Sequence, residues 1–112
     1  MNRLRKEVFE VKPDFVGEEW AGTWTVNELT ALELIEVDEE LIEAARRKGV
    51  EPTFDLKTYN LLLLSKSVRK NGKKVKLEEL KRMPAKLYRL IYDACQKLNM
   101  ITPEEERFLR KK

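Results

Sequence analysis

The stretch DLKTYNLLLLSKSV, residues 55–68, has the apolar pattern that is most informative about the fold. At 3.6 residues per turn it carries two apolar stripes, Leu56, Tyr59 and Leu63 on one and Leu61, Leu64 and Val68 on the other, with Leu62 on a third side. A helix on a protein surface needs only one stripe, so this helix is expected to contact neighbours on at least two sides. We therefore predict that it lies at the centre of a small helical domain.

Length and composition exclude several classes of protein. The chain has 112 residues, which suits one domain with one core. It has one cysteine, Cys95, and no histidine, so the commonest zinc ligand and general base are missing and a reducing compartment is expected. No signal-peptide pattern and no apolar run of about 18 residues is present. We expect a cytoplasmic protein with no membrane partner; the Lys- and Glu-rich composition is typical of thermophiles.

The net charge of +3 is small, but the charges are segregated along the chain. Between residues 28 and 43 every ionisable side chain is acidic: Glu28, Glu33, Glu36, Asp38, Glu39, Glu40 and Glu43. Between residues 66 and 76 every one is basic: Lys66, Arg69, Lys70, Lys73, Lys74 and Lys76. Such blocks can pair within one chain or between neighbouring copies.

The first 27 residues are predicted to form a β-hairpin. Residues 7–11 have a strand-like composition, and residues 20–26 place Trp20, Trp24 and Val26 on one face at a period of two. A lone two-stranded ribbon is marginally stable in water. The apolar side chains of this hairpin therefore need the helices, or another subunit, to pack against.

A helix is predicted from about residue 31 to Gly49. Thr30 and Glu33 have the spacing of a capping box, and Gly49 follows a basic last turn. The expected apolar stripe consists of Ala31, Leu34, Ile35, Leu41, Ile42 and Ala45. This stripe would bury Asp38, so we expect the helix to break there, with Asp38 as a new N-cap; the alternative is that Asp38 is a functional acid.

Further helices follow the central one, which is expected to extend to Asn71-Gly72. A basic loop at 73–76 leads to a short helix over 77–83, and Pro84 starts a second core helix that ends at Leu98. After Thr102 we expect a last short helix that bears Phe108 and Leu109. The fold class is mainly α, a bundle of four to five helices with an N-terminal β-hairpin, in a single domain (1–112) divided into the hairpin (1–27) and a helical core (28–112).

The sequence contains no grouping that indicates catalysis, so we expect a protein that is not an enzyme. Neighbouring carboxylates such as Glu39 and Glu40, or Glu78 and Glu79, diverge by about 100° on a helix and do not form an acid–base pair. No glycine-rich phosphate loop is present, and Cys95 lies beside a core stripe as a small apolar residue. No catalytic, metal-binding or cofactor-binding residue is predicted, and no cofactor.

Two groups of residues are candidates for binding. The apolar group could form core or a protein interface; it comprises Trp20, Trp24, Tyr88, Tyr92, Phe108 and Leu109. The basic group could contact a polyanion or form a solvated turn; it comprises Arg69, Lys70, Lys73, Lys74 and Lys76.

The second half of the chain resembles the tail assembly chaperones of long-tailed phages. The resemblance lies in LLLLSKSV (61–68), Asn71-Gly72, LEEL (77–80), MPAKLY (83–88), Leu98-Asn99 and TPEE (102–105), with WAGTWTV (20–26) and ELT (28–30) upstream. It implies a small helical protein that coats the tape measure protein, assists polymerisation of tail tube subunits and self-associates. Many such proteins are extended by a ribosomal frameshift, for which Lys111-Lys112 would suit a slippery codon run. The alternative function is a small nucleic-acid-binding or regulatory module that uses the basic loop 66–76.

Overall fold

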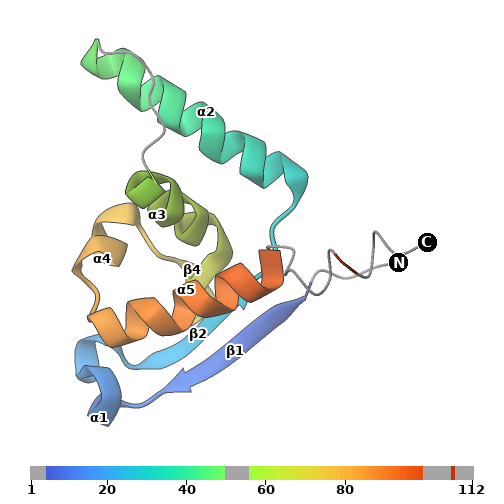
Figure 1. The fold of residues 1–112 in the computed structure, drawn as a ribbon. Helices are drawn as coiled ribbons and strands as arrows, with labels where there is room; N and C mark the ends of the chain where they lie inside the picture. Colours follow the sequence, from blue (N-terminus) through green and yellow to red (C-terminus); the bar gives the residue numbers. More distant parts are fainter. Residues whose placement is uncertain (1–4, 50–55, 100–106, 108–112) are drawn as a thin grey trace.

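The computed structural model describes residues 5–49, 56–99 and 107 (Figure 1). The elements in chain order are β1 (Lys6–Val11), α1 (Pro13–Val16), the 3-10 turn η1 (Glu18–Trp20), β2 (Gly22–Asn27), α2 (Ala31–Lys48), α3 (Leu56–Ser67), β3 (Val68–Lys70), β4 (Lys73–Lys74), α4 (Leu77–Arg82) and α5 (Ala85–Asn99). The predicted last helix, with Phe108 and Leu109, and the pair Lys111-Lys112 lie outside the described residues.

The four strands form one antiparallel sheet in the order β1-β2-β3-β4. The expected hairpin of β1 and β2 is confirmed, with Phe9 opposite Trp24. The prediction that the central helix continues to Asn71 and leads into a basic loop is wrong, because the chain turns into β3 at Val68, which pairs with Val26. Asn71 (φ 51°) and Gly72 (φ 82°) then form the two-residue turn of a second hairpin. The fold is thus mainly helical but includes a sheet larger than the expected hairpin.

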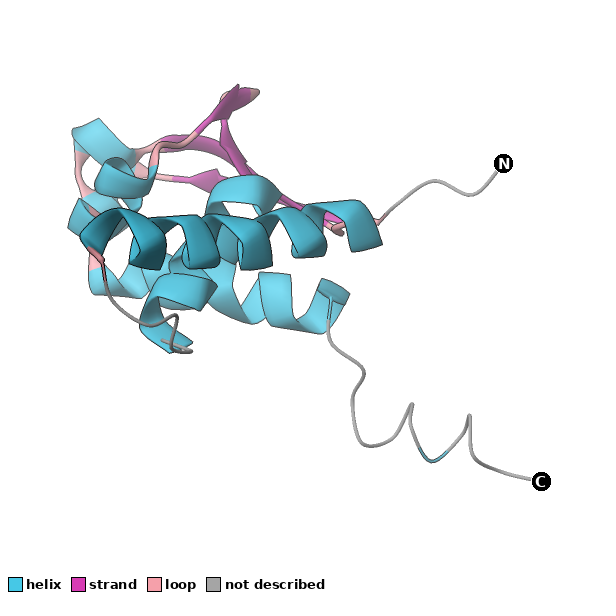
Figure 2. Cartoon of the chain, turned by 90° about the horizontal axis from the view of Figure 1, so that it is seen from above, coloured by secondary structure: helices cyan, strands magenta, loops and turns pink. Residues whose placement is uncertain are grey.

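Helices cover one face of the sheet, so that strands and helices form two layers (Figure 2). The side chains between the two layers are apolar and buried, and they come mainly from the sheet and from α3, α4 and α5. The cluster consists of Val11, Trp24, Val26, Leu64, Val68, Val75, Leu80, Met83, Leu87, Ile91, Ala94, Cys95 and Leu98. Burial of these residues away from water is the main source of stability for this part of the fold.

Helix α3 contacts neighbours on two sides, as predicted. Leu64 belongs to the main cluster, whereas Leu63 belongs to a second, smaller one with Leu29 and Val37. Tyr59 and Leu62 pack against this second cluster. The leucine-rich helix is therefore shared between two cores, one under the sheet and one under α2.

Helix α2 is continuous, and the predicted break at Asp38 is wrong. The inward side of this helix runs through the partly buried Leu34 and the fully buried Val37, which pack on α3. Asp38 is one position, about 100°, further round the helix and is exposed, so its carboxylate needs no break to reach solvent.

The helices in the described part of the chain include none with the length and hydropathy of a membrane span.

Candidate functional site

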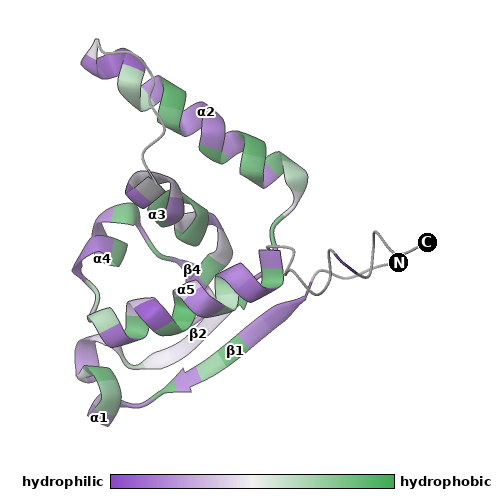
Figure 3. Cartoon of the chain, in the orientation of Figure 1, coloured by the Kyte–Doolittle hydropathy of each residue, from purple (hydrophilic) through white to green (hydrophobic). Residues whose placement is uncertain are grey.

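The solvent side of α2 carries a row of exposed apolar side chains. Leu32 is 64% exposed, Ile35 is 53% exposed and Ile42 is 43% exposed. The predicted stripe combined Ile35 and Ile42 with Leu34, which is partly buried against α3, but the helix separates them onto different faces. Apolar and polar segments consequently alternate along α2 in Figure 3. Apolar residues that recur at helical spacing on an exposed face are typical of a surface that packs on a partner.

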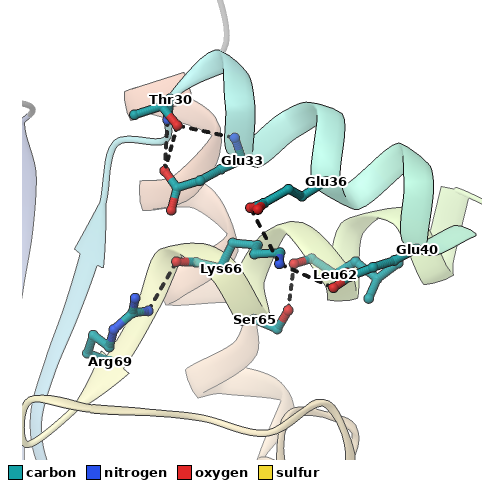
Figure 4. Close-up of polar contacts among 8 residues, drawn as sticks. All are labelled: Thr30, Glu33, Glu36, Glu40, Leu62, Ser65, Lys66 and Arg69. Atoms are coloured by element: carbon teal, nitrogen blue, oxygen red, sulfur yellow. Dashed lines mark hydrogen bonds and ion pairs between the residues drawn. The ribbon is translucent and has the colours of Figure 1, made fainter.

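Both ends of α2 are capped, which keeps this face regular. The Glu33 backbone N–H donates to the Thr30 Oγ at 3.1 Å, and the Thr30 backbone N–H donates to a Glu33 carboxylate oxygen at 2.9 Å (Figure 4). This is the predicted capping box, and it is confirmed. At the other end Gly49 has φ 70° and donates its N–H to the carbonyls of Ala45 and Arg46.

The acidic and basic blocks of the sequence meet through Lys66. Its ammonium lies 3.8 Å from a Glu36 carboxylate oxygen and 3.2 Å from one of Glu40, across the α2–α3 contact (Figure 4). Because the Lys66 side chain is only 22% exposed, solvent screens these ion pairs less than it would those of a fully solvated lysine. The two helices are thus joined by ion pairs at the rim of their small shared core.

The two tryptophans are stacked, with ring centroids 6.4 Å apart. Trp24 has no exposed surface, and its indole N–H donates to the Trp20 carbonyl at 2.8 Å. A side chain with no exposed surface cannot touch a partner, so Trp24 is corrected from a candidate contact to a core residue. Trp20 is half-buried against the core, and the Lys70 ammonium lies 6.0 Å from the centroid of one of its rings.

The two tyrosines of α5 remain partly exposed. Tyr88 and Tyr92 are stacked with ring centroids 5.8 Å apart, and both pack against the main core. Burial raises the pKa of the Tyr88 phenol, with smaller contributions from Tyr92 and Cys95. Tyr88 also lines an open depression of about 420 Å³ between α3, α4 and α5. Its other lining residues are Lys57, Asn60, Leu61, Leu80, Lys81, Met83 and Ala85.

The basic residues of the second hairpin fall into two groups. Arg69 donates to the carbonyls of Lys66 and Val68, and Lys70 donates to the Glu19 carbonyl at 2.6 Å, so both are held by the fold. Lys73, Lys74 and Lys76 are exposed and form no ion pair with any residue that the structure describes. Only this second group is fully available to a polyanion.

The described residues include no group of three or more Cys, Asp or Glu side chains that could hold a metal ion. The Cys95 thiol is 2% exposed, and burial raises its pKa, while hydrogen bonds with Ser67 and Asn99 partly offset that rise. A protonated, inaccessible thiol is a poor nucleophile.

No family model, curated protein or solved structure matches this chain. Function therefore has to be inferred from the surfaces that the fold exposes.

The most exposed apolar residues were not among the predicted binding residues. Leu32, Ile35 and Ile42 are missing from that set, as is Phe15, which is 40% exposed with the Lys86 ammonium 5.0 Å from its ring centroid. Aromatic size guided the prediction, and large aromatics are the residues that a small core buries first. The informative feature is the width of the apolar pattern on residues 31–48. Its apolar side chains span a wider arc of the helix than a single neighbouring helix, α3, can cover.

Proposed function

We propose that this protein is a non-catalytic assembly chaperone or adaptor of a phage or proviral tail, which holds apolar segments of a tape measure-like partner on α2 and so assists assembly of the tail tube. The observation that supports this function is the exposed row of Leu32, Ile35 and Ile42 on a well-capped helix. Covering such side chains contributes about 1–2 kcal/mol each. The resemblance to tail assembly chaperones supplies the class of partner.

The charges beside this row indicate the chemistry of the bound segment. Asp38 and Glu39 lie between Ile35 and Ile42 in sequence, and both are exposed. An apolar helix that carries Lys or Arg at its centre would pair with them, whereas an acidic helix would be repelled. We therefore expect α2 to bind amphipathic, basic segments in preference to acidic ones.

Co-expression with the tape measure protein of a long-tailed phage tests the proposal. The parent protein should increase the soluble fraction of that partner, and Ile35→Glu should abolish most of the increase. Phe15→Glu is the matched control, because it places the same charge on an exposed apolar site outside α2. Both substitutions are at exposed positions and should change the free energy of unfolding by no more than about 0.5 kcal/mol.

Two results would contradict the proposal. One is an Ile35→Glu variant that solubilises the partner as well as the parent does. The other is a gene neighbourhood without virion genes, since a tail chaperone is expected between a tail tube gene and a long coiled-coil tape measure gene.

The three exposed lysines of the second hairpin favour nucleic-acid binding as the second candidate function. Binding through Lys73, Lys74 and Lys76 would neutralise about three phosphates, so affinity should fall roughly 40-fold between 50 and 200 mM salt. Fluorescence anisotropy with a labelled oligonucleotide measures this slope. The double variant Lys73→Glu/Lys74→Glu should then remove binding, and a salt-independent signal would exclude this function.

A further inference from the structure

Strand β1 is a six-residue edge of the sheet, and one of its two sides pairs with β2. Among the strands that the structure describes, none pairs with the other side. An unpaired strand edge presents a row of backbone N–H and C=O groups that another strand can use. The edge is long enough to be a template and has no proline between Lys6 and Val11.

The backbone bonds identify which residues face away from β2. The Arg5 carbonyl accepts from the Glu28 N–H at 2.8 Å, so Arg5 faces β2. Thr23, opposite Glu10, uses its backbone N–H and C=O for Asn71, at 3.0 and 2.7 Å, and so does not bond to β1. Because facing alternates along an antiparallel strand, the free backbone groups of β1 belong to Lys6, Val8 and Glu10.

The side chains of these three residues are exposed and are self-complementary. Along β1 the order is basic Lys6, apolar Val8 and acidic Glu10, each two residues apart, and Val8 at the centre is 51% exposed. Among the described residues, Lys6 forms no ion pair, and the only donor to the Glu10 carboxylate is the Thr23 hydroxyl, at 2.9 and 3.1 Å. Read in the opposite direction the order is acidic, apolar, basic, which is the charge pattern of a matching antiparallel strand.

We infer that β1 is a dimer interface and that its partner is β1 of a second copy of this chain. With a two-fold axis at Val8, Lys6 faces Glu10 of the other copy, Val8 faces Val8, and each facing pair has its free backbone groups directed at the other strand. The two sheets then form one continuous sheet. Opposite charges placed directly across such a pair of strands stabilise it.

The register is specific, because other registers lose the charge match. A slip of two residues one way sets Lys6 against Lys12 and Val8 against Glu10. A slip of two the other way sets Lys6 against Val8, and a slip of one directs paired backbone groups away from each other. The interface is small, so the dimer should be weak and dependent on concentration.

This inference does not rest on the proposed function. Figure 1 shows β1 along the lower edge of the molecule and α2 along the upper one, so dimerisation leaves the exposed row of α2 free. A dimer would present two copies of that row to one long partner, which increases the apparent affinity for it.

Charge reversal tests the register. Sedimentation equilibrium over a range of protein concentrations should show a monomer–dimer equilibrium for the parent. Lys6→Glu and Glu10→Lys should each raise the dissociation constant roughly tenfold, because each creates two like-charged pairs in the dimer. The double variant Lys6→Glu/Glu10→Lys restores both opposite-charge pairs and should return the constant to near the parent value.

Removal of a backbone donor tests the strand pairing itself. Val8→Pro deletes an N–H that faces away from β2, so the fold should persist by circular dichroism while the dimer is lost. Val8→Thr retains the N–H and is the matched control. A parent that is monomeric at all concentrations overturns the inference. So does a dimer that is unchanged in both single charge variants, or one that is lost only in Ile35→Glu, which would place the interface on α2.

Discussion

At the scale of single residues, Ser67 is a buried polar side chain with a defined structural task. Its hydroxyl donates to the Asn27 carbonyl at 2.6 Å, and the Asn27 amide donates back to the Ser67 carbonyl at 3.2 Å. The pair fixes the end of α3 to the end of β2, where the chain changes from helix to strand. The hydroxyl thus helps to set the position at which the central helix stops.

Replacement of Ser67 by alanine should therefore be costly. Ser67→Ala leaves the partly buried Asn27 carbonyl without this donor, and we expect a loss of about 1–3 kcal/mol in the free energy of unfolding. Ser65→Ala is the control, since the Ser65 hydroxyl donates to the Leu62 carbonyl of its own helix and should cost under about 0.5 kcal/mol. Urea denaturation measures both; equal losses would contradict this assignment.

The buried thiol of Cys95 should make the free energy of unfolding depend on pH in the alkaline range. Its folded-state pKa is raised by burial, so the folded state keeps the thiol proton to higher pH than the unfolded state does. The contribution of this thiol to the free energy of unfolding is complete below the pKa of the unfolded thiol, about 8.5. It is lost as the pH rises through the pKa of the folded state. Unfolding free energies measured from about pH 8 to 10.5 should decline, and Cys95→Ala should flatten the first part of that decline. A parent profile with the same slope as Cys95→Ala would disprove this.

At the scale of elements, the contact between α2 and α3 combines a small core with the ion pairs of Lys66. Lys66→Met should cost about 0.5–1 kcal/mol at low ionic strength, because two carboxylates lose their shared partner. The cost should shrink in about 1 M salt, where the Debye length is about 3 Å. Lys81→Met is the control: the Lys81–Glu78 pair lies on the exposed side of a single helix, and its loss should cost less than half as much. Salt-independent destabilisation by Lys66→Met would show that packing of the side chain dominates.

The elements that could be predicted are those whose signals are local. The capping box at Thr30, the stop at Gly49 and the two-sided burial of α3 depend on residues a few positions apart, and all three are confirmed. The strand at Val68 was missed because its pairing with Val26 is remote in sequence, and the neighbouring lysines have a loop-like composition. The Asn71-Gly72 pair was read as a helix end, although the same pair is also a strong hairpin signal.

The candidate surface could be predicted less well than the fold. The sequence shows that 31–48 has apolar residues on a broad arc, but only the packed structure shows which part of that arc α3 covers. Ile35 and Ile42 were expected to be buried and instead lie in the exposed row. Exposure depends on where a neighbour is placed in space, and periodicity alone does not contain that information.

At the scale of the whole molecule, the two cores differ in size, which predicts unequal local stability. The cluster under α2 is buried around Leu29, Val37 and Leu63, whereas the cluster under the sheet draws on α3, α4, α5 and all the longer strands. Helices held by fewer buried contacts open at lower free energy than the rest of a fold. We expect α2 to open in a sub-global step while the sheet and α5 remain folded.

Native-state hydrogen exchange measures this difference. Amides in the middle of α2 should exchange at a lower opening free energy than those of α5 and β2. Val37→Ala truncates a fully buried side chain. It should lower the opening free energy of α2 by about 1–2 kcal/mol and leave that of α5 nearly unchanged. Leu32→Ala is the control, since an exposed side chain contributes little to the opening energy. Uniform acceleration across both cores would show that the domain opens only as one unit.

The turn at Asn71-Gly72 also bears on the chemical durability of the protein. Asparagine followed by glycine is prone to deamidation, because glycine has no side chain to hinder the attack of its backbone nitrogen on the asparagine side-chain carbonyl. Conversion to aspartate would keep the oxygen that accepts from the Thr23 N–H and add a negative charge beside Lys70 and Lys73. Conversion to isoaspartate would lengthen the backbone and break the hairpin. Aged preparations should therefore separate into an acidic form that stays folded and a second form in which the end of the sheet has come apart.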